Sequence, residues 1–211
     1  MAAASIVLAD TAISHADTIV PLAGAELTKT LSDGTAVTVR IAGESANINP
    51  SLGDTPLHRN AWVSASAQVE LSGNNSDVGG SIYPGYIVGC QVNIAGGNVN
   101  GGPSGGLDWS DGQTVRPSAG ANGGASLTLG PGQAKSFYVL DLEAPDPFGA
   151  DTHNNFNMFK GNNGSVTWAD ETIGLSGCAG YAQARSFVSV EVITPTVTSW
   201  ITVYGQPFSI G

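Results

Sequence analysis

Three carboxylates between residues 141 and 146 have the spacing in this sequence that most readily suggests chemistry. Asp141, Glu143 and Asp146 could supply the acid and base of a glycosidase or the oxygen ligands of a calcium ion. The apolar and proline residues that separate them instead favour the end of a strand that runs into a surface loop. We therefore expect no functional carboxylate cluster at this position.

A second acidic segment, Asp108-Trp109-Ser110-Asp111-Gly112, follows a stretch rich in glycine, asparagine, proline and serine. Asp-Gly is a favoured pair in tight turns, because both residues tolerate the backbone angles that a turn requires. Turn formation is therefore one role for Asp108 and Asp111. An electrostatic role toward cations is the alternative.

The sequence offers no motif of metal binding and little support for catalysis. It contains no His-Glu-x-x-His and no glycine loop of the kind that cradles a phosphate. Its histidines, His15, His58 and His153, are scattered, and no Cys-x-x-Cys accompanies them. We expect no enzyme, no cofactor and no metal site.

The composition is typical of an all-β protein with excess negative charge. The 211 residues include 29 glycines, and 17 acidic against 7 basic residues give a formal net charge of −10. This charge argues against nucleic acid as a partner, since binding it requires Lys and Arg on the phosphates. Excess acid favours cations near any opening of the protein. A soluble acidic secreted domain explains the charge equally well.

Two features indicate export. Residues 2–9 resemble a stub of a signal-peptide hydrophobic region, and Ser14-His15-Ala16 fits a small-x-small cleavage site. We therefore assign residues 1–16 to a signal-peptide remnant. The two cysteines, Cys90 and Cys178, then predict one disulfide, and two buried thiols are the alternative. No run of 18 apolar residues is present, which excludes a spanning helix.

Alternation of apolar and polar residues predicts the strands. Two alternating runs flank Asp33-Gly34, which predicts a hairpin. Further strands are expected at residues 61–71, 82–94, 135–142, 165–168, 182–193 and 197–204, with a loop up to residue 163. Strands on both sides of a long excursion favour a β-sandwich from which one hairpin projects.

The longest alternating segment is Gly112–Gly130, with apolar or small residues at every second position. A transmembrane barrel strand needs about 9–11 residues of this pattern. The arm that precedes it lacks a clean apolar face beyond Ile94. A glycine-rich surface loop at residues 95–125 is therefore the alternative.

Four segments, in matching order and spacing, resemble the MspA-type porins of the mycolic-acid outer membrane of actinobacteria. Together they span residues 27–211. They are Leu31-Ser32-Asp33-Gly34-Thr35, Pro56-Leu57-His58-Arg59-Asn60 with the strand that ends at Gly73, Gly85-Tyr86-Ile87-Val88-Gly89, and Ser199-Trp200-Ile201-Thr202-Val203-Tyr204-Gly205-Gln206-Pro207-Phe208.

The resemblance implies an all-β fold in which a β-sandwich rim domain carries a long β-hairpin that joins an oligomeric transmembrane β-barrel. Residues 17–94 and 126–211 would form the rim domain, and residues 95–125 the barrel and constriction hairpin. One hairpin alone leaves backbone groups unpaired in hydrocarbon, so insertion and oligomerisation would be the same event. Expected partners are further copies, typically in an octamer, or a related porin subunit in a hetero-oligomer, together with outer-membrane lipid.

The family narrows its pore with a ring of Asp next to a Gly near the hairpin turn. In this sequence Asp111 precedes Gly112, Ser110 replaces the second acid, and Asp108 would supply it. A carboxylate ring attracts cations. The resemblance places Asp108, Trp109, Ser110 and Asp111 at the constriction, and Arg116, Ser118, Asn122 and Ser126 on the lumen face, where Arg116 opposes the acidic ring.

The resemblance therefore implies an exported porin of the outer (mycolate) membrane. It would pass small hydrophilic solutes and ions by passive diffusion and prefer cations. The alternative, from another functional class, is a secreted β-sandwich binding or adhesion module that forms no pore.

Overall fold

The computed structural model describes residues 17–50, 57–73, 77–92, 98–101, 125–128, 132–145, 147–149 and 151–211. Every regular secondary-structure element in these segments is a β-strand, which confirms the all-β prediction. The same segments contain no helix that is long and apolar enough to span a membrane.

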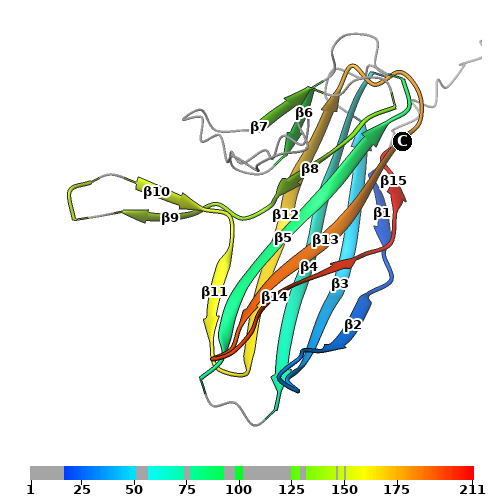
Figure 1. Ribbon diagram of the computed structural model, residues 1–211. Coiled ribbons are helices and arrows are strands. Elements are labelled where there is room, and N and C mark those ends of the chain that lie inside the picture. The colour runs from blue at the N-terminus through cyan, green and yellow to red at the C-terminus, as the bar shows by residue number, and fades with distance from the viewer. Residues whose placement is uncertain are drawn as a thin grey trace, which may run out of the picture.

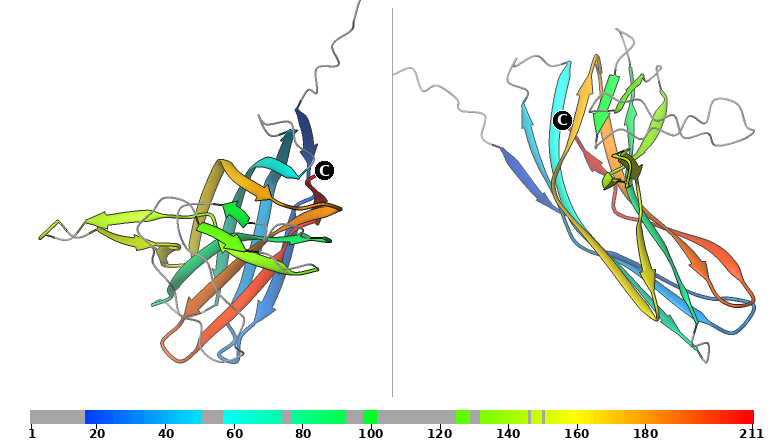
Figure 2. Two further views of the ribbon diagram at one scale, coloured as in Figure 1. Left: turned by 90° about the horizontal axis from the view of Figure 1, so that it is seen from above. Right: turned by 90° about the vertical axis from the view of Figure 1, so that its left-hand side faces the viewer.

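Two sheets stack face to face as a sandwich, which the right-hand view of Figure 2 shows edge-on. The first, sheet A, has seven strands in the order β1-β3-β4-β12-β6-β7, with β2 also paired to β3. Its strands are β1 (Thr18–Pro21), β2 (Ala25–Thr30), β3 (Ala36–Pro50), β4 (His58–Ser72), β6 (Asn98–Gly101), β7 (Ala125–Thr128) and β12 (Asn163–Ser176).

The second sheet, sheet B, has six strands and lies in front of sheet A in Figure 1. Its central strands follow the order β11-β5-β13-β14, with β8 paired to β5 and β15 paired to β13. The strands are β5 (Gly79–Cys90), β8 (Ala134–Tyr138), β11 (Asn157–Lys160), β13 (Ala182–Ile193), β14 (Thr198–Tyr204) and β15 (Phe208–Ser209).

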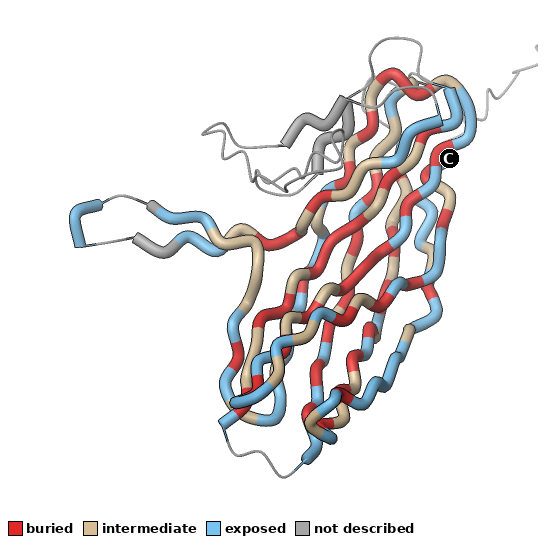
Figure 3. The backbone as a smooth tube through the Cα atoms, viewed as in Figure 1, coloured by how far each residue is buried: buried red, intermediate tan, exposed pale blue. Residues whose placement is uncertain are grey.

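The core lies between the two sheets and is built from alternate residues of the long strands, as the red segments of Figure 3 trace. In β3, Val37, Val39 and Ile41 are almost fully buried. From sheet B, Val188 and Val190 of β13 belong to the same core. The predicted period of two therefore sets which face of each strand points inward.

The hairpin expected around Asp33-Gly34 is present, with β2 and β3 antiparallel on either side of the turn. The Thr35 amide donates a hydrogen bond to Asp33 Oδ1 at 3.0 Å. Gly34 has a φ of 84°, a conformation that glycine adopts without steric cost. The local sequence therefore specifies this turn.

The structure differs from the predicted elements between residues 135 and 176. The single strand expected at residues 135–142 is two strands, because β8 ends at Tyr138 and β9 (Leu142–Pro145) begins a separate hairpin with β10 (Asp151–Asn154). This hairpin projects from the sandwich in Figure 1. Strand β12 is also much longer than residues 165–168, because a bulge between Trp168 and Glu171 interrupts its alternation without ending it.

Candidate functional site

The chain leaves and re-enters the sandwich through two short paired strands. Strand β6 adds to sheet A by pairing with β12, Val99 opposite Leu175 and Gly101 opposite Ile173. Strand β7 pairs antiparallel with β6, with Gly101 opposite Ala125. Gly101 and Ala125, the described residues that flank residues 102–124, therefore lie side by side, as at the base of a hairpin.

The backbone ties both ends of this excursion to the sandwich. Gly132 donates its amide to the Cys90 carbonyl at 3.2 Å, and the Cys90 amide donates to the Gln133 carbonyl at 3.3 Å. On the opposite side, the Gln91 amide donates to the Tyr181 carbonyl at 2.9 Å. The segment where the excursion begins is thus held between the segment that returns from it and the start of β13.

The predicted disulfide between Cys90 and Cys178 is confirmed, with a Cα–Cα distance of 5.9 Å. Cys90 is the last residue of β5 in sheet B, and Cys178 follows the end of β12 in sheet A. The bond therefore joins the two sheets where the excursion begins. Both cysteines are buried, so the bond is part of the packed interior.

Most of the residues that the sequence places in a pore lie outside the described part of the chain. These residues are Asp108, Trp109, Ser110, Asp111, Arg116, Ser118 and Asn122. Ser126 lies in β7, where it pairs in register with Asn100 of β6. The constriction and lumen assignments thus stay predictions, as do the domain boundaries.

Of the three carboxylates at residues 141–146, Glu143 lies in β9 of the projecting hairpin and Asp141 directly precedes that strand. Asp141 Oδ1 lies 2.7 Å from His153 Nδ1, and Glu143 is opposite His153 in the register of β9 and β10. Asp146 is outside the described residues. Within the described residues no three His, Cys, Asp or Glu side chains are grouped so that they could hold a metal ion.

A buried carboxyl group in β3 was not singled out from the sequence. Glu44 is 2% exposed, and both of its carboxylate oxygens lack a hydrogen bond of good geometry within the described segments. Burial raises the pKa of Glu44, and the nearby Ser186 hydroxyl opposes this rise in part. A Cβ at Gly205 would collide with the Ser186 and Glu44 side chains, which would have to move to make room for it.

The outer face of sheet B carries a cluster of aromatic side chains that the sequence reading missed. The Tyr83 ring centroid lies 5.9, 5.0 and 5.2 Å from those of Tyr138, Phe156 and Trp200, and Tyr138 lies 5.7 Å from Phe187. We call these five residues the aromatic face. The signal that could have revealed it is that both faces of β5 and β13 carry large apolar residues.

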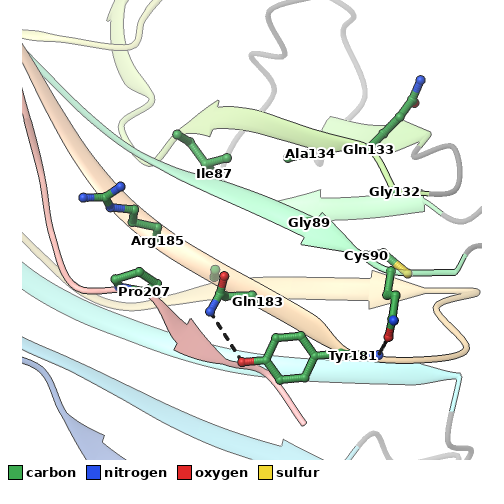
Figure 4. A pocket seen from close by; sticks show the side chains of 12 residues that line it. Ile87, Gly89, Cys90, Gly132, Gln133, Ala134, Tyr181, Gln183, Arg185 and Pro207 are labelled. Atoms are coloured by element: carbon green, nitrogen blue, oxygen red, sulfur yellow. Dashed lines mark hydrogen bonds between the residues drawn. The ribbon is translucent and has the colours of Figure 1, made fainter.

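A cavity of about 750 Å³ lies beside the aromatic face, between β5, β8, β13 and Pro207 (Figure 4). Arg185 lines it, donating from Nε to the Gly205 carbonyl at 2.8 Å and lying 4.9 Å from the Tyr204 ring centroid. No carboxylate of the described segments forms an ion pair with Arg185. The cavity therefore presents a guanidinium group that is held in place but has no acidic partner there.

Comparison with known proteins gives one result that bears on function. A solved structure described as manganese lipoxygenase of Gaeumannomyces graminis with a partial zonadhesin of Komagataella pastoris is similar over 97% of this chain and 77% of its own, at 10% identity. Its TM-score of 0.18 is too low to support any argument. No curated protein matches the chain. The family model described as MspA matches residues 33–209, which is well over half of the chain.

Proposed function

We propose that this chain, which belongs to the MspA family of porins, assembles with further subunits into a water-filled channel through the outer membrane. The channel would let small hydrophilic solutes and ions diffuse passively, with cations preferred. Porins of this family are oligomers of the mycobacterial outer membrane. For this chain the expected assembly is an octamer of identical copies or a hetero-oligomer with a related subunit.

The observation that carries the proposal is the antiparallel pairing of β6 and β7. These two strands form the base of a hairpin at one end of sheet A, and β7 is the terminal strand of the described order. A single hairpin cannot remain in hydrocarbon, because the backbone groups at its two edges would stay unpaired. Several copies that close a barrel satisfy those groups, so the hairpin requires an oligomer.

The length of the excursion suits this role. Gln113 lies midway between the paired residues Gly101 and Ala125, so a hairpin that kept this register would turn there. Each of the two strands of this hairpin would then continue for about 11 residues beyond β6 or β7. This length matches the 9–11 residues of a tilted transmembrane strand. We assign residues 95–125 to this barrel and constriction hairpin, residues 17–94 and 126–211 to the rim domain, and residues 1–16 to the signal peptide.

Cation preference follows from the residues next to this midpoint. Asp108 and Asp111 would form a carboxylate ring near the turn, with Trp109 and Ser110 beside them. A ring of several copies focuses a negative potential between low-dielectric walls, and this potential attracts cations at short range. Arg116 on the returning arm opposes it, while Ser118, Asn122 and Ser126 would keep the lumen wall polar.

The experiment that tests the proposal is conductance across a planar lipid bilayer. Purified protein should produce stepwise current increments as channels insert. A variant that lacks residues 96–122 should retain the Cys90–Cys178 disulfide and a cooperative unfolding transition but produce no current. A bilayer that stays silent with the full chain, over a range of detergents and protein concentrations, would instead favour a secreted binding or adhesion module.

A further inference from the structure

The hairpin formed by β9 and β10, which we call the arm, is a two-stranded sheet that pairs with no other described strand. It points away from the sandwich in Figure 1 and in the left-hand view of Figure 2. An isolated two-stranded hairpin is marginally stable in water at best. Packing against a further surface would therefore stabilise the arm.

The arm presents apolar side chains to solvent. Phe148, at the turn, is 94% exposed, and Leu142 in β9 is 43% exposed. Removing the apolar surface of such side chains from water is favourable. The turn of the arm thus carries a group that gains free energy if another surface covers it.

The aromatic face is a surface of the matching kind. Several outward positions of sheet A are polar, as in Thr38, Ser66 and Gln68, and Trp62 is an exposed aromatic exception there. On the outward side of sheet B, Trp200 is 54% exposed and contacts Tyr83, which is itself part of an aromatic cluster. An antiparallel sheet that faces water on one side normally has polar residues there. Apolar residues on both sides of sheet B indicate that its outer face is also covered.

The arm and the surface beside the aromatic face carry opposite charges. Residues 141–151 contain four acidic residues and no Lys or Arg. Beside the aromatic face, Arg185 lines the cavity without a carboxylate partner in the described segments. Opposite charges on two surfaces favour their association and fix its orientation.

We infer that the arm of one copy docks on the aromatic face and the Arg185 cavity of a neighbouring copy. This inference rests on the proposed oligomeric porin and assigns the contact between its rim domains. The two surfaces differ, so the contact is heterologous, and repeated contacts of this type form a ring when the rotation between neighbouring copies closes. A ring of rim domains would bring the hairpins together for barrel closure.

Photo-cross-linking tests the inference on the assembled full-length protein. With benzoylphenylalanine in place of Phe148, irradiation should link two copies, and mass spectrometry should locate the link in β5, β13, β14 or the cavity lining. The same photoreactive residue in place of Trp62, an exposed aromatic of sheet A, should give no link to those strands. Links confined to one copy, to lipid or to other surfaces would overturn the inference.

Charge reversal provides the second variant set. Glu143→Lys and Arg185→Glu should each reduce the yield of the Phe148 cross-link, and the double variant should restore it. No rescue, with both single variants folded, would contradict the docking. If channels conduct while the links map elsewhere, only the inference fails; if the protein stays monomeric and the bilayer silent, the proposed function fails with it.

Discussion

The indole Nε1 of Trp168 donates a hydrogen bond to the Tyr86 hydroxyl at 3.2 Å across the interior of the sandwich. Trp168 lies in β12 of sheet A and Tyr86 in β5 of sheet B. Both side chains are buried, and their rings meet edge to face with centroids 6.4 Å apart. The pair therefore fixes the position of β12, the strand to which the base of the excursion is attached.

Tyr86→Phe should destabilise the protein by about 1–3 kcal/mol, because it leaves the buried indole N–H without an acceptor. Chemical denaturation in urea measures this change in the free energy of unfolding. Tyr204→Phe is the matched control, since the Tyr204 side chain is half exposed and its loss should change stability by less than about 0.5 kcal/mol. Equal effects of the two variants would contradict a structural role for the hydrogen bond.

Glu44→Gln should stabilise the protein increasingly as the pH rises. Burial raises the pKa of Glu44 above its ordinary value. The protein is therefore at its full stability, as far as this group is concerned, below the ordinary pKa of Glu, where the carboxyl group is neutral. That stabilisation is lost as the pH rises through the pKa of the folded state. The difference between variant and wild type should therefore grow with pH, by at most about 1.4 kcal/mol per pH unit.

Asp33→Asn is the control with the opposite sign. Hydrogen bonds from the Thr194 hydroxyl and the Thr35 amide lower the pKa of Asp33. Its contribution to stability is present above the ordinary pKa of Asp and disappears as the pH falls through the lowered value. Both variants should therefore match the wild type at low pH and differ from it as the pH rises, Glu44→Gln by being more stable and Asp33→Asn by being less stable. Differences of the same sign would refute the assignment.

Replacing both Cys90 and Cys178 by serine should lower the free energy of unfolding by about 4–5 kcal/mol. The disulfide closes a loop with a sequence separation of 88 residues, and the chain-entropy account gives this order of magnitude for such a loop. Reducing the wild type should have a similar effect, whereas reductant should not affect the variant. Two titratable thiols in the denatured, unreduced wild type would rule out the bond.

Alternation predicted the long strands well because the core determines it. The predicted strands at residues 61–71 and 182–193 coincide closely with β4 and β13, whose inward residues are buried. The sequence predicts only residues 165–168 of β12, because Asp170, at a φ of 55°, lies in the bulge that shifts the alternation. The arm was missed because its four-residue strands are too short to display a period.

The candidate site is harder to predict from the sequence, for a different physical reason. The disulfide could be anticipated because a chain with two cysteines allows only one intramolecular bond. The surface that covers the aromatic face could not be anticipated in this way. Alternation shows that the two faces of a strand differ, but it does not show what lies against the outer face. The constriction depends on contacts among several copies, which the sequence of one chain records only through a family resemblance.

The double variant Asp108→Asn/Asp111→Asn should lose most of the cation preference while assembling normally. A narrow ring acts on an ion at contact distance, whereas charges elsewhere on the rim are screened beyond about 8 Å at physiological ionic strength. The reversal potential across a salt gradient measures the preference. Glu70→Gln, on the exposed side of β4, should leave it unchanged. An unaltered reversal potential in the double variant would show that the two Asp serve only as turn formers.

Thiol accessibility in open channels tests most directly whether the excursion lines the pore. Both native cysteines are bonded to each other, so Ser118→Cys and Ala119→Cys each introduce a single free thiol, on opposite faces of the proposed strand. A charged thiol reagent added to conducting channels should reduce the current in steps for Ser118→Cys and leave Ala119→Cys and the wild type unchanged. If the current through Ser118→Cys channels does not change although mass spectrometry shows the thiol modified, the hairpin does not line the pore.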